Sequence, residues 1–232
     1  LPINGYDTGE LSDRYPNLFV PAGLTFSIWG LIYLFLIAFV IYQFVKTDFK
    51  EITPHHFISK ISFLFVINCI ANISWILLWH HQMILLSFIV MLIILGSLIL
   101  IYQRLEIGLR KVRFSCKWFV HVPFSIYLGW ITVATIANAT TLLVHWGWDG
   151  FGLPESVWAM IMIFIATLVG LRVFTDRHDV AYVLVLVWAF LGIFIKRYGI
   201  SGYQDSVAIA AATGGILLII SMIWGVIQKK KS

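Results

Sequence analysis

Residues 83–102 read MILLSFIVMLIILGSLILIY, twenty consecutive residues without a charged side chain. A transmembrane helix needs about 20 predominantly apolar residues, so this stretch is long enough to cross a bilayer. Its residues do not alternate between apolar and polar, as they would in a strand of a transmembrane barrel. A helix is therefore expected, because it satisfies its backbone hydrogen bonds internally within lipid.

Comparable apolar runs recur along the whole chain. Six more lie at 21–44, 58–79, 117–145, 155–173, 180–195 and 206–228, and the segments between them carry turn residues and charges. Of the 232 residues, 60% are hydrophobic and only 12% charged, whereas a soluble domain has about 25% charged residues. We predict an all-α polytopic bundle of seven transmembrane spans, with no room for a separate soluble domain.

The basic residues predict how the bundle is oriented. Thirteen Lys and Arg fall on one side of the predicted spans, namely Lys46, Lys50, Lys60, Arg104, Arg110, Lys111, Arg113, Lys117, Arg172, Arg177, Lys229, Lys230 and Lys231. The other side has Arg14, Lys196 and Arg197. Because cytoplasmic loops are enriched in basic residues, we expect the N-terminus outside and the C-terminus in the cytoplasm. The net charge of +5 is then a topology signal, with some attraction to lipid headgroups, and nucleic acid is not an expected partner.

Ionisable side chains are nearly absent from the interior of the spans. Lys196 falls at the end of a span, where its amine can reach the interface. His121, just before Pro123, is the exception, and we interpret it as a hydrogen-bonded group near the interface. The histidine pairs at 55–56 and 80–81 lack further ligands at metal spacing. We therefore expect neither a metal site nor catalytic residues, and prefer a binding role to an enzymatic one.

Polar and aromatic residues form stripes on the first, second and fourth spans. At spacings of three and four they share one helix face. The stripes are Phe26, Trp29 and Tyr33; Asn68, Asn72, Trp75 and Trp79; and Pro123, Tyr127, Trp130, Ala134 and Asn138. Because amides in hydrocarbon need partners, these faces should point inward. They predict either a pocket for a flat apolar ligand that stacks on aromatic rings or plain interhelical packing, and the stripes alone do not decide between the two.

Small residues recur at four-residue spacing in the fifth and last spans. Such residues let helix backbones approach closely. We expect packing within the bundle, with a homodimer interface as the alternative. The pairs are Ala166 and Gly170, Ala208 and Ala212, Ala210 and Gly214, and Ala211 and Gly215.

Three segments that carry the stripes resemble the TspO/MBR family, the tryptophan-rich sensory proteins that include the translocator protein. They are PNLFVPAGLTFSIWGLIYL at 16–34, ANISWILLW at 71–79 and PFSIYLGWITVATIAN at 123–138. The first departs from the family pattern by having Ala22 in place of a second proline and Leu24 in place of a tryptophan, with one residue fewer before Trp29. The third has three extra residues after Pro123. The motifs occur in the family's order, over about residues 15–141.

The resemblance implies a division of the chain. Family members have five helices, and the proline-containing segment opens their second. Residues 1–145 would then be a TspO-like core, whose first helix lies upstream of Leu1 and makes an eighth span. Residues 146–232 would be a three-helix membrane extension.

The resemblance also implies a function. Family members bind porphyrins, sterols and similar molecules in an intramembrane pocket, with sensing, transport or receptor roles, so we expect a small apolar ligand, a bound porphyrin or a membrane lipid, in a bacterial plasma membrane. A secondary transporter of another small molecule and a light-dependent porphyrin-degrading enzyme are the alternatives. The ligand-binding residues implied are Phe26, Trp29, Tyr33, Asn72, Trp75, Trp130, Ala134 and Asn138.

Overall fold

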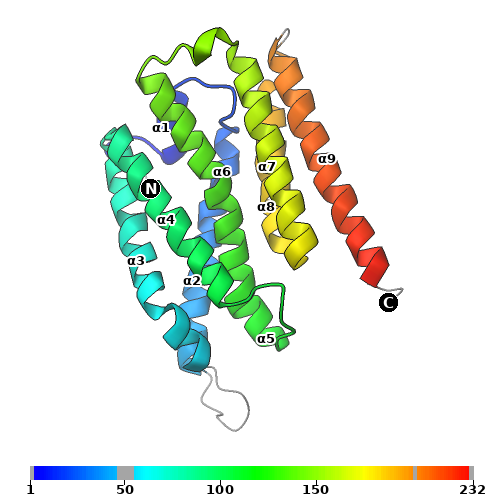
Figure 1. Cartoon of the computed structure of the whole chain (residues 1–232). Helices are drawn as coiled ribbons and strands as arrows, with labels where there is room; N and C mark the ends of the chain where they lie inside the picture. The colour runs from blue at the N-terminus through cyan, green and yellow to red at the C-terminus, as the bar shows by residue number, and fades with distance from the viewer. Residues whose placement is uncertain (1–2, 46–54, 201–202, 230–232) are drawn as a thin grey trace.

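The computed structural model of the chain describes residues 3–45, 55–200 and 203–229 (Figure 1). Within these residues the chain is helical, apart from turns, loops and an isolated bridge between Ile3 and Tyr6. The longer elements are α2 (Ile28–Val45), α3 (His55–His80), α4 (Ile84–Arg104), α6 (Val122–His145), α7 (Glu155–Arg177), α8 (Val180–Arg197) and α9 (Tyr203–Lys229). The shorter ones are α1 (Thr8–Asp13), the 3-10 turns η1 (Gly23–Ser27) and η3 (Gly150–Gly152), α5 (Phe114–Cys116) and the π-helical turn η2 (Lys117–His121).

The described residues contain seven helices long and apolar enough to span a membrane. This confirms the predicted all-α polytopic bundle. The fifth and sixth spans run to Arg177 and Arg197, past the predicted ends, because charged residues continue the helix. In the last turns of α7, for example, Arg172 pairs with Asp176 one turn later (2.8 Å).

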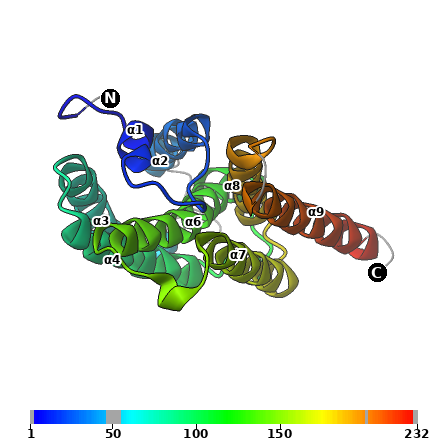
Figure 2. The same ribbon diagram turned by 90° about the horizontal axis from the view of Figure 1, so that it is seen from above.

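α6 is the central helix of the bundle. It packs against α4 on one side and α8 on the other, while α3 packs on α4 and α7 and α9 pack on α8. Seen from above, α2 and α8 lie on the same side of α6 (Figure 2). The helices that carry the polar-aromatic stripes are therefore neighbours around α6.

Two glycines allow the tightest approaches to α8. A Cβ atom added at Gly129 of α6 would lie 2.9 Å from the backbone oxygen of Tyr182. At Gly192 of α8, an added Cβ would collide with the Thr25 hydroxyl in η1, and the Gly192 carbonyl accepts a hydrogen bond from the Ala22 amide (3.1 Å). Side chains at these positions would push the backbones apart.

Small residues of the last span pack within the bundle. Ala208 and Ala211 are fully buried. A Cβ atom added at Gly214 would lie 2.6 Å from the Thr167 hydroxyl of α7 and 3.0 Å from the Phe190 ring of α8. These contacts account for the small residues without a dimer, and the homodimer stays an untested alternative.

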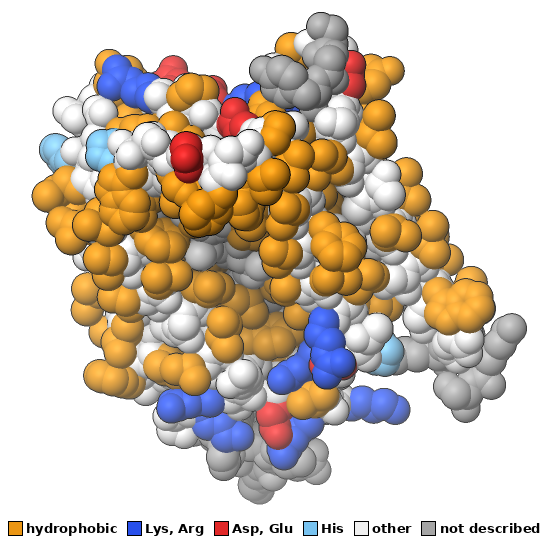
Figure 3. Space-filling view, turned by 45° about the horizontal axis from the view of Figure 1, so that its top comes forward, with side chains coloured by type: hydrophobic (Ala, Val, Ile, Leu, Met, Phe, Trp, Pro, Cys, Tyr) orange, Lys and Arg blue, Asp and Glu red, His pale blue; other side chains and the backbone are white. Residues whose placement is uncertain are grey.

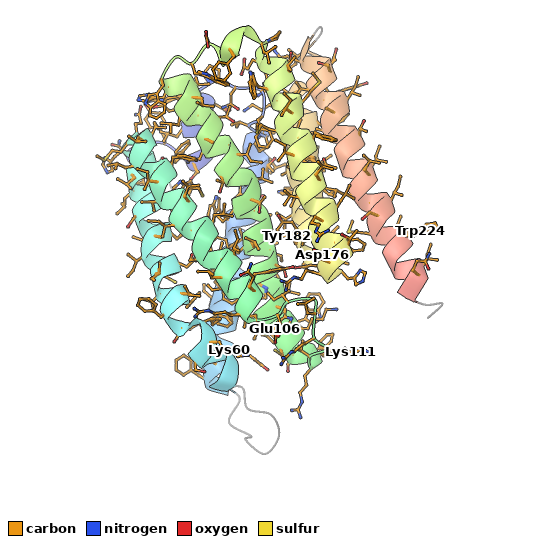
Figure 4. The ribbon with its side chains drawn as sticks, viewed as in Figure 1. Lys60, Glu106, Lys111, Asp176, Tyr182 and Trp224 are labelled. Carbon is orange, nitrogen blue, oxygen red and sulfur yellow. The ribbon has the colours of Figure 1, made fainter. Side chains whose placement is uncertain are left out.

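Basic side chains separate to the two ends of the molecule (Figures 3 and 4). Arg14, Lys196 and Arg197 lie at the end that carries α1. The opposite end, here called the basic end, carries the other described basic residues, Lys60 and Lys111 among them. Lys46, Lys50, Lys230 and Lys231 lie outside the described residues, as does the side chain of Lys229. The separation agrees with the predicted topology, while the direction of insertion stays a prediction.

The close approach of α6 to α8 can be tested with one methyl group. Gly129→Ala should lower the free energy of unfolding by about 1–3 kcal/mol, because the methyl group meets backbone that cannot rotate away. Gly96→Ala in α4 is the control, since an added Cβ there meets no atom within 4 Å. Thermal unfolding of both variants in detergent measures the difference, and equal melting temperatures would contradict the tight α6–α8 interface.

Candidate ligand site

Trp29 lies at the centre of an aromatic cluster between α2, α3 and α6. Its ring stacks on Tyr33 (centroids 5.6 Å apart) and on Trp75 (5.4 Å). It also meets Tyr127 and Trp130 edge to face, at 6.0 and 6.4 Å. Aromatic pairs of this kind contribute about 0.5–1.5 kcal/mol each beyond the area they bury. The stripes on the three helices thus converge on one indole.

Indole rings, rather than close backbone contacts, join α2 to α3. α2 approaches α6 closely but has few close backbone approaches to α3. Helix separation depends on the size of the side chains at the contact. Here Trp29 stacks on Trp75, and Trp75 stacks in turn on Trp79 (6.1 Å). A wall of flat rings fills the space between the two helices.

Asn72 is the polar link between the three helices. Its Oδ1 accepts a hydrogen bond from the Tyr33 hydroxyl (3.0 Å), and its Nδ2 donates to the Tyr127 hydroxyl (2.8 Å). Asn68, one turn earlier, donates instead to Ser97 of α4 (2.9 Å). Both amides therefore have the interhelical role that the packing interpretation assigned to them. Sequence reasoning placed Tyr127 on the stripe but did not include it among the site residues.

Six of the eight predicted site residues line one small cavity. They are Phe26, Trp29, Trp75, Trp130, Ala134 and Asn138. The cavity measures about 30 Å³, room for about one water molecule. The other two predicted residues, Tyr33 and Asn72, lie beside it in the hydrogen-bonded link. The structure therefore brings the eight together, but in a closed arrangement.

Four polar groups at this cavity have no hydrogen-bond partner among the described residues. They are the indole nitrogens of Trp75, Trp79 and Trp130 and the hydroxyl of Thr141. All four side chains are at most 4% exposed. Buried polar groups are nearly always hydrogen-bonded, and one left unpaired costs about 1–3 kcal/mol. Because an indole N–H can only donate, the cavity is suited to hydrogen-bond acceptors.

A short helix that the sequence analysis did not predict covers this cavity. Leu11 of α1 is fully buried, and Thr8 and Ser12 contribute to the cavity lining. The helix starts with a capping box, in which the Asp7 carboxylate accepts from the Glu10 amide (2.8 Å) and the Glu10 carboxylate accepts from the Asp7 amide (2.9 Å). The spacing Asp7-x-x-Glu10 is the sequence signal that could have located it.

Polar contacts fasten the α1 segment to the rest of the bundle. Lys196 of α8 forms an ion pair with Asp13. The Asn4 side-chain amide donates to the His80 carbonyl at the end of α3 (3.1 Å), and the Arg197 guanidinium donates to the Leu18 carbonyl (3.3 Å). A further bond joins Trp188 Nε1 of α8 to the Thr25 carbonyl of η1 (3.0 Å). The hydrogen bonds among these contacts are partly buried, and together the contacts join α1, the segments on either side of it and η1 to α3 and α8.

The dimensions of the cavity limit what it can hold as it stands. Pockets for small molecules usually measure about 300–1,000 Å³, at least about ten times the space here. Two larger grooves exist, of about 600 Å³ beside α6 and α7 and about 1160 Å³ between α2 and α8, but none of the eight predicted residues lines either. A flat ligand would therefore need the lining to move apart. The described residues contain no group of three His, Cys, Asp or Glu that could hold a metal ion.

Comparison with known proteins gives one match. A family model described as TSPO-like protein matches residues 1–224. No curated protein and no solved structure matches the chain. The matched residues contain the three segments that resemble the TspO/MBR family and also α7, α8 and most of α9, while the division at residue 145 stays a prediction. Since the match spans nearly the whole chain, this membrane protein belongs to the TSPO-like protein family.

Proposed function

We propose that this membrane protein binds a flat apolar ligand with hydrogen-bond acceptors in the aromatic cavity beneath α1, for sensing or transport. A tetrapyrrole is the leading ligand, since it combines a flat ring system with carboxylate acceptors. The observation that carries the proposal is that three tryptophans with unpaired indole N–H groups, and Thr141 with an unpaired hydroxyl, all line one cavity. Plain packing would leave these donors unpaired, at a cost of about 1–3 kcal/mol each.

Aromatic stacking would provide the second part of recognition. Trp29 and Trp75 present nearly parallel rings, 26° apart, with Trp130 close to perpendicular to Trp29 at 85°. A flat ligand that took the place of one ring in this stack would keep a π-face against the other. Its acceptors would meet the donors on α3 and α6.

Access would come from the α1 end. The helix has six residues and buries Leu11 and Ser12, while its ion pair from Asp13 to Lys196 is partly exposed and of the kind that contributes about 0–1 kcal/mol. Such a segment opens at a lower cost than the packed spans beneath it. We therefore assign α1 the role of a gate over the cavity.

The arrangement favours binding over ion-coupled transport. Secondary transporters typically place substrate and ion sites near the bilayer midplane, at discontinuous helices. In the described spans the departures from α-helix, η1 and η2, lie at span ends. Light-dependent breakdown of a bound porphyrin would use the same cavity, and a spectral change in bound protoporphyrin on illumination would distinguish it from passive binding.

Deleting donors tests the ligand site. Trp130→Phe keeps an aromatic ring and removes the N–H, and Thr141→Val removes the hydroxyl at similar size. Each should weaken protoporphyrin binding about 5- to 10-fold, the value of about one hydrogen bond, when the fluorescence of the porphyrin is titrated with purified protein. Trp118→Phe is the matched control, because that side chain is 43% exposed and lies outside the cavity lining. Equal affinities in the wild type and the three variants would contradict the site assignment.

Loosening α1 tests the gate. Lys196→Ala removes the ion pair with Asp13 and should raise the association rate of protoporphyrin by up to about fivefold, in line with an exposed ion pair of at most about 1 kcal/mol. Arg172→Ala removes a similar pair, with Asp176, that does not touch α1. Stopped-flow measurements should show faster association in the first variant only. An identical rate in both would mean that α1 does not control entry.

Labelling tests the proposed orientation, with the α1 end outside. In a protein with Cys69 and Cys116 replaced by Ser, Leu153→Cys introduces a thiol at the α1 end and Lys111→Cys one at the basic end. A membrane-impermeant maleimide applied to intact cells should label the first and spare the second, and lysed cells should be labelled at both. The reverse pattern would invert the topology.

A further inference from the structure

A groove of about 1160 Å³ lies between α2 and α8 at the basic end, separate from the aromatic cavity. Its floor is α6, through Val122, Ser125 and Ile126. α2 and α8 flank this floor on the same side of α6 (Figure 2) and do not pack closely on one another. The groove is therefore open along its length to the surrounding membrane.

The walls of the groove are apolar and face lipid. Leu31 of α2 is 44% exposed and Leu184 of α8 is 51% exposed. The α8 wall runs from Val180 to Trp188, which at 1.5 Å per residue is about 12 Å of helix. One leaflet contributes about 15 Å of hydrocarbon. An occupant of the groove must be apolar over most of the depth of a leaflet.

At the membrane surface, by contrast, the groove is charged and ends among basic side chains. Arg110, Lys111, Lys117 and Arg177 line it there (Figure 4 labels Lys111). Asp179 is the one acidic residue among the described residues of the lining. Its carboxylate accepts from the Tyr102 hydroxyl (2.8 Å) and the Tyr182 amide (3.2 Å), so both oxygens are bound to the bundle.

Lys111 and Lys117 are the cations that remain available. Arg110 pairs with Glu106 (2.7 Å), and Arg177 donates to the Ile107 carbonyl (3.2 Å). Both lysines are exposed, and neither has a carboxylate within ion-pair distance among the described residues. Positive charge is thus concentrated at one end of an apolar groove.

The charged rim is held in a fixed position. Gly108 has φ of +82°, and a Cβ atom there would collide with the Arg177 carbonyl oxygen. The loop at 105–113 therefore sits directly on the C-terminal end of α7, where Arg177 binds its backbone. The backbone of this loop is therefore already in place before a ligand binds.

We propose that this groove binds an anionic phospholipid of the adjoining leaflet, with its phosphate at Lys111 and Lys117 and an acyl chain along α2 and α8. Charge complementarity selects the head group, and the exposed leucines account for the chain. A soluble phosphate would leave the apolar walls uncovered. A second copy of the chain would bring two cationic rims together. The partly exposed Trp118 beside the rim suits the interface where head groups lie.

Native mass spectrometry of the full chain in detergent tests the proposal. The probes are phosphatidylglycerol, phosphatidylcholine and glycerol phosphate, and the variants are Lys111→Gln and Lys117→Gln, singly and together. Phosphatidylglycerol affinity should fall about fivefold per lysine and so about 25-fold for the pair, with little change for phosphatidylcholine. Lys60→Gln is the control for each single lysine variant, because it removes one charge at the same end on α3, outside the groove. Melting temperatures establish that all variants are folded.

Three results would overturn the proposal. An equal loss in Lys60→Gln would show general surface attraction rather than a site. Binding of glycerol phosphate as tight as that of phosphatidylglycerol would identify a site for soluble anions. A dimer in delipidated wild-type protein that the double variant abolishes would identify a second copy as the occupant. None of these results depends on the aromatic cavity, so the phospholipid site and the ligand site succeed or fail separately.

Discussion

A carboxamide in hydrocarbon has to find partners, and Asn72 meets this constraint by joining three helices at one point. Its two hydrogen bonds, from Tyr33 and to Tyr127, fix how far α2 and α6 are rotated and displaced relative to α3. A helix turned by one residue, or about 100°, would leave the amide unpaired. That register is also the one in which Trp29 faces Trp75 and Trp130. The hydrogen bonds of Asn72 thus hold the three helices in the register that brings the rings of the aromatic cluster together.

Much of the fold could be predicted because a membrane leaves a sequence few options. Within a membrane, a stretch of twenty uncharged residues such as 83–102 must form a helix. A spacing of three or four residues, as between Asn72 and Trp75, predicts which residues share a helix face. Seven of the residues on the stripes that this spacing defined line the cavity. The distribution of Lys and Arg identified the two ends of the bundle.

What could not be predicted depends on contacts between distant segments. The cavity volume is set by how the rings of Trp29, Trp75 and Trp130 fit together, and no spacing along one helix reports that fit. α1 is too short for a hydrophobic period, and only its capping box marks it. Likewise the groove at Lys111 and Lys117 exists because α2 and α8, which are far apart in sequence, flank α6 without packing closely on one another. Sequence reasoning counted those lysines as topology signals with some attraction to lipid headgroups, and placed no binding site there.

The hydrogen bond from Trp188 to the Thr25 carbonyl has a consequence for communication across the bundle. Trp188 is part of the groove lining, while Thr25 precedes Phe26 of the aromatic cavity. One bond of 3.0 Å thus connects a residue of the groove to the direct chain neighbour of a cavity residue. Displacing η1 on ligand entry must either carry the Trp188 indole with it or break the bond. In either case the lipid-facing groove would change shape if the proposed ligand displaced η1, and the composition of the surrounding bilayer would then become a variable in the affinity of the proposed ligand site.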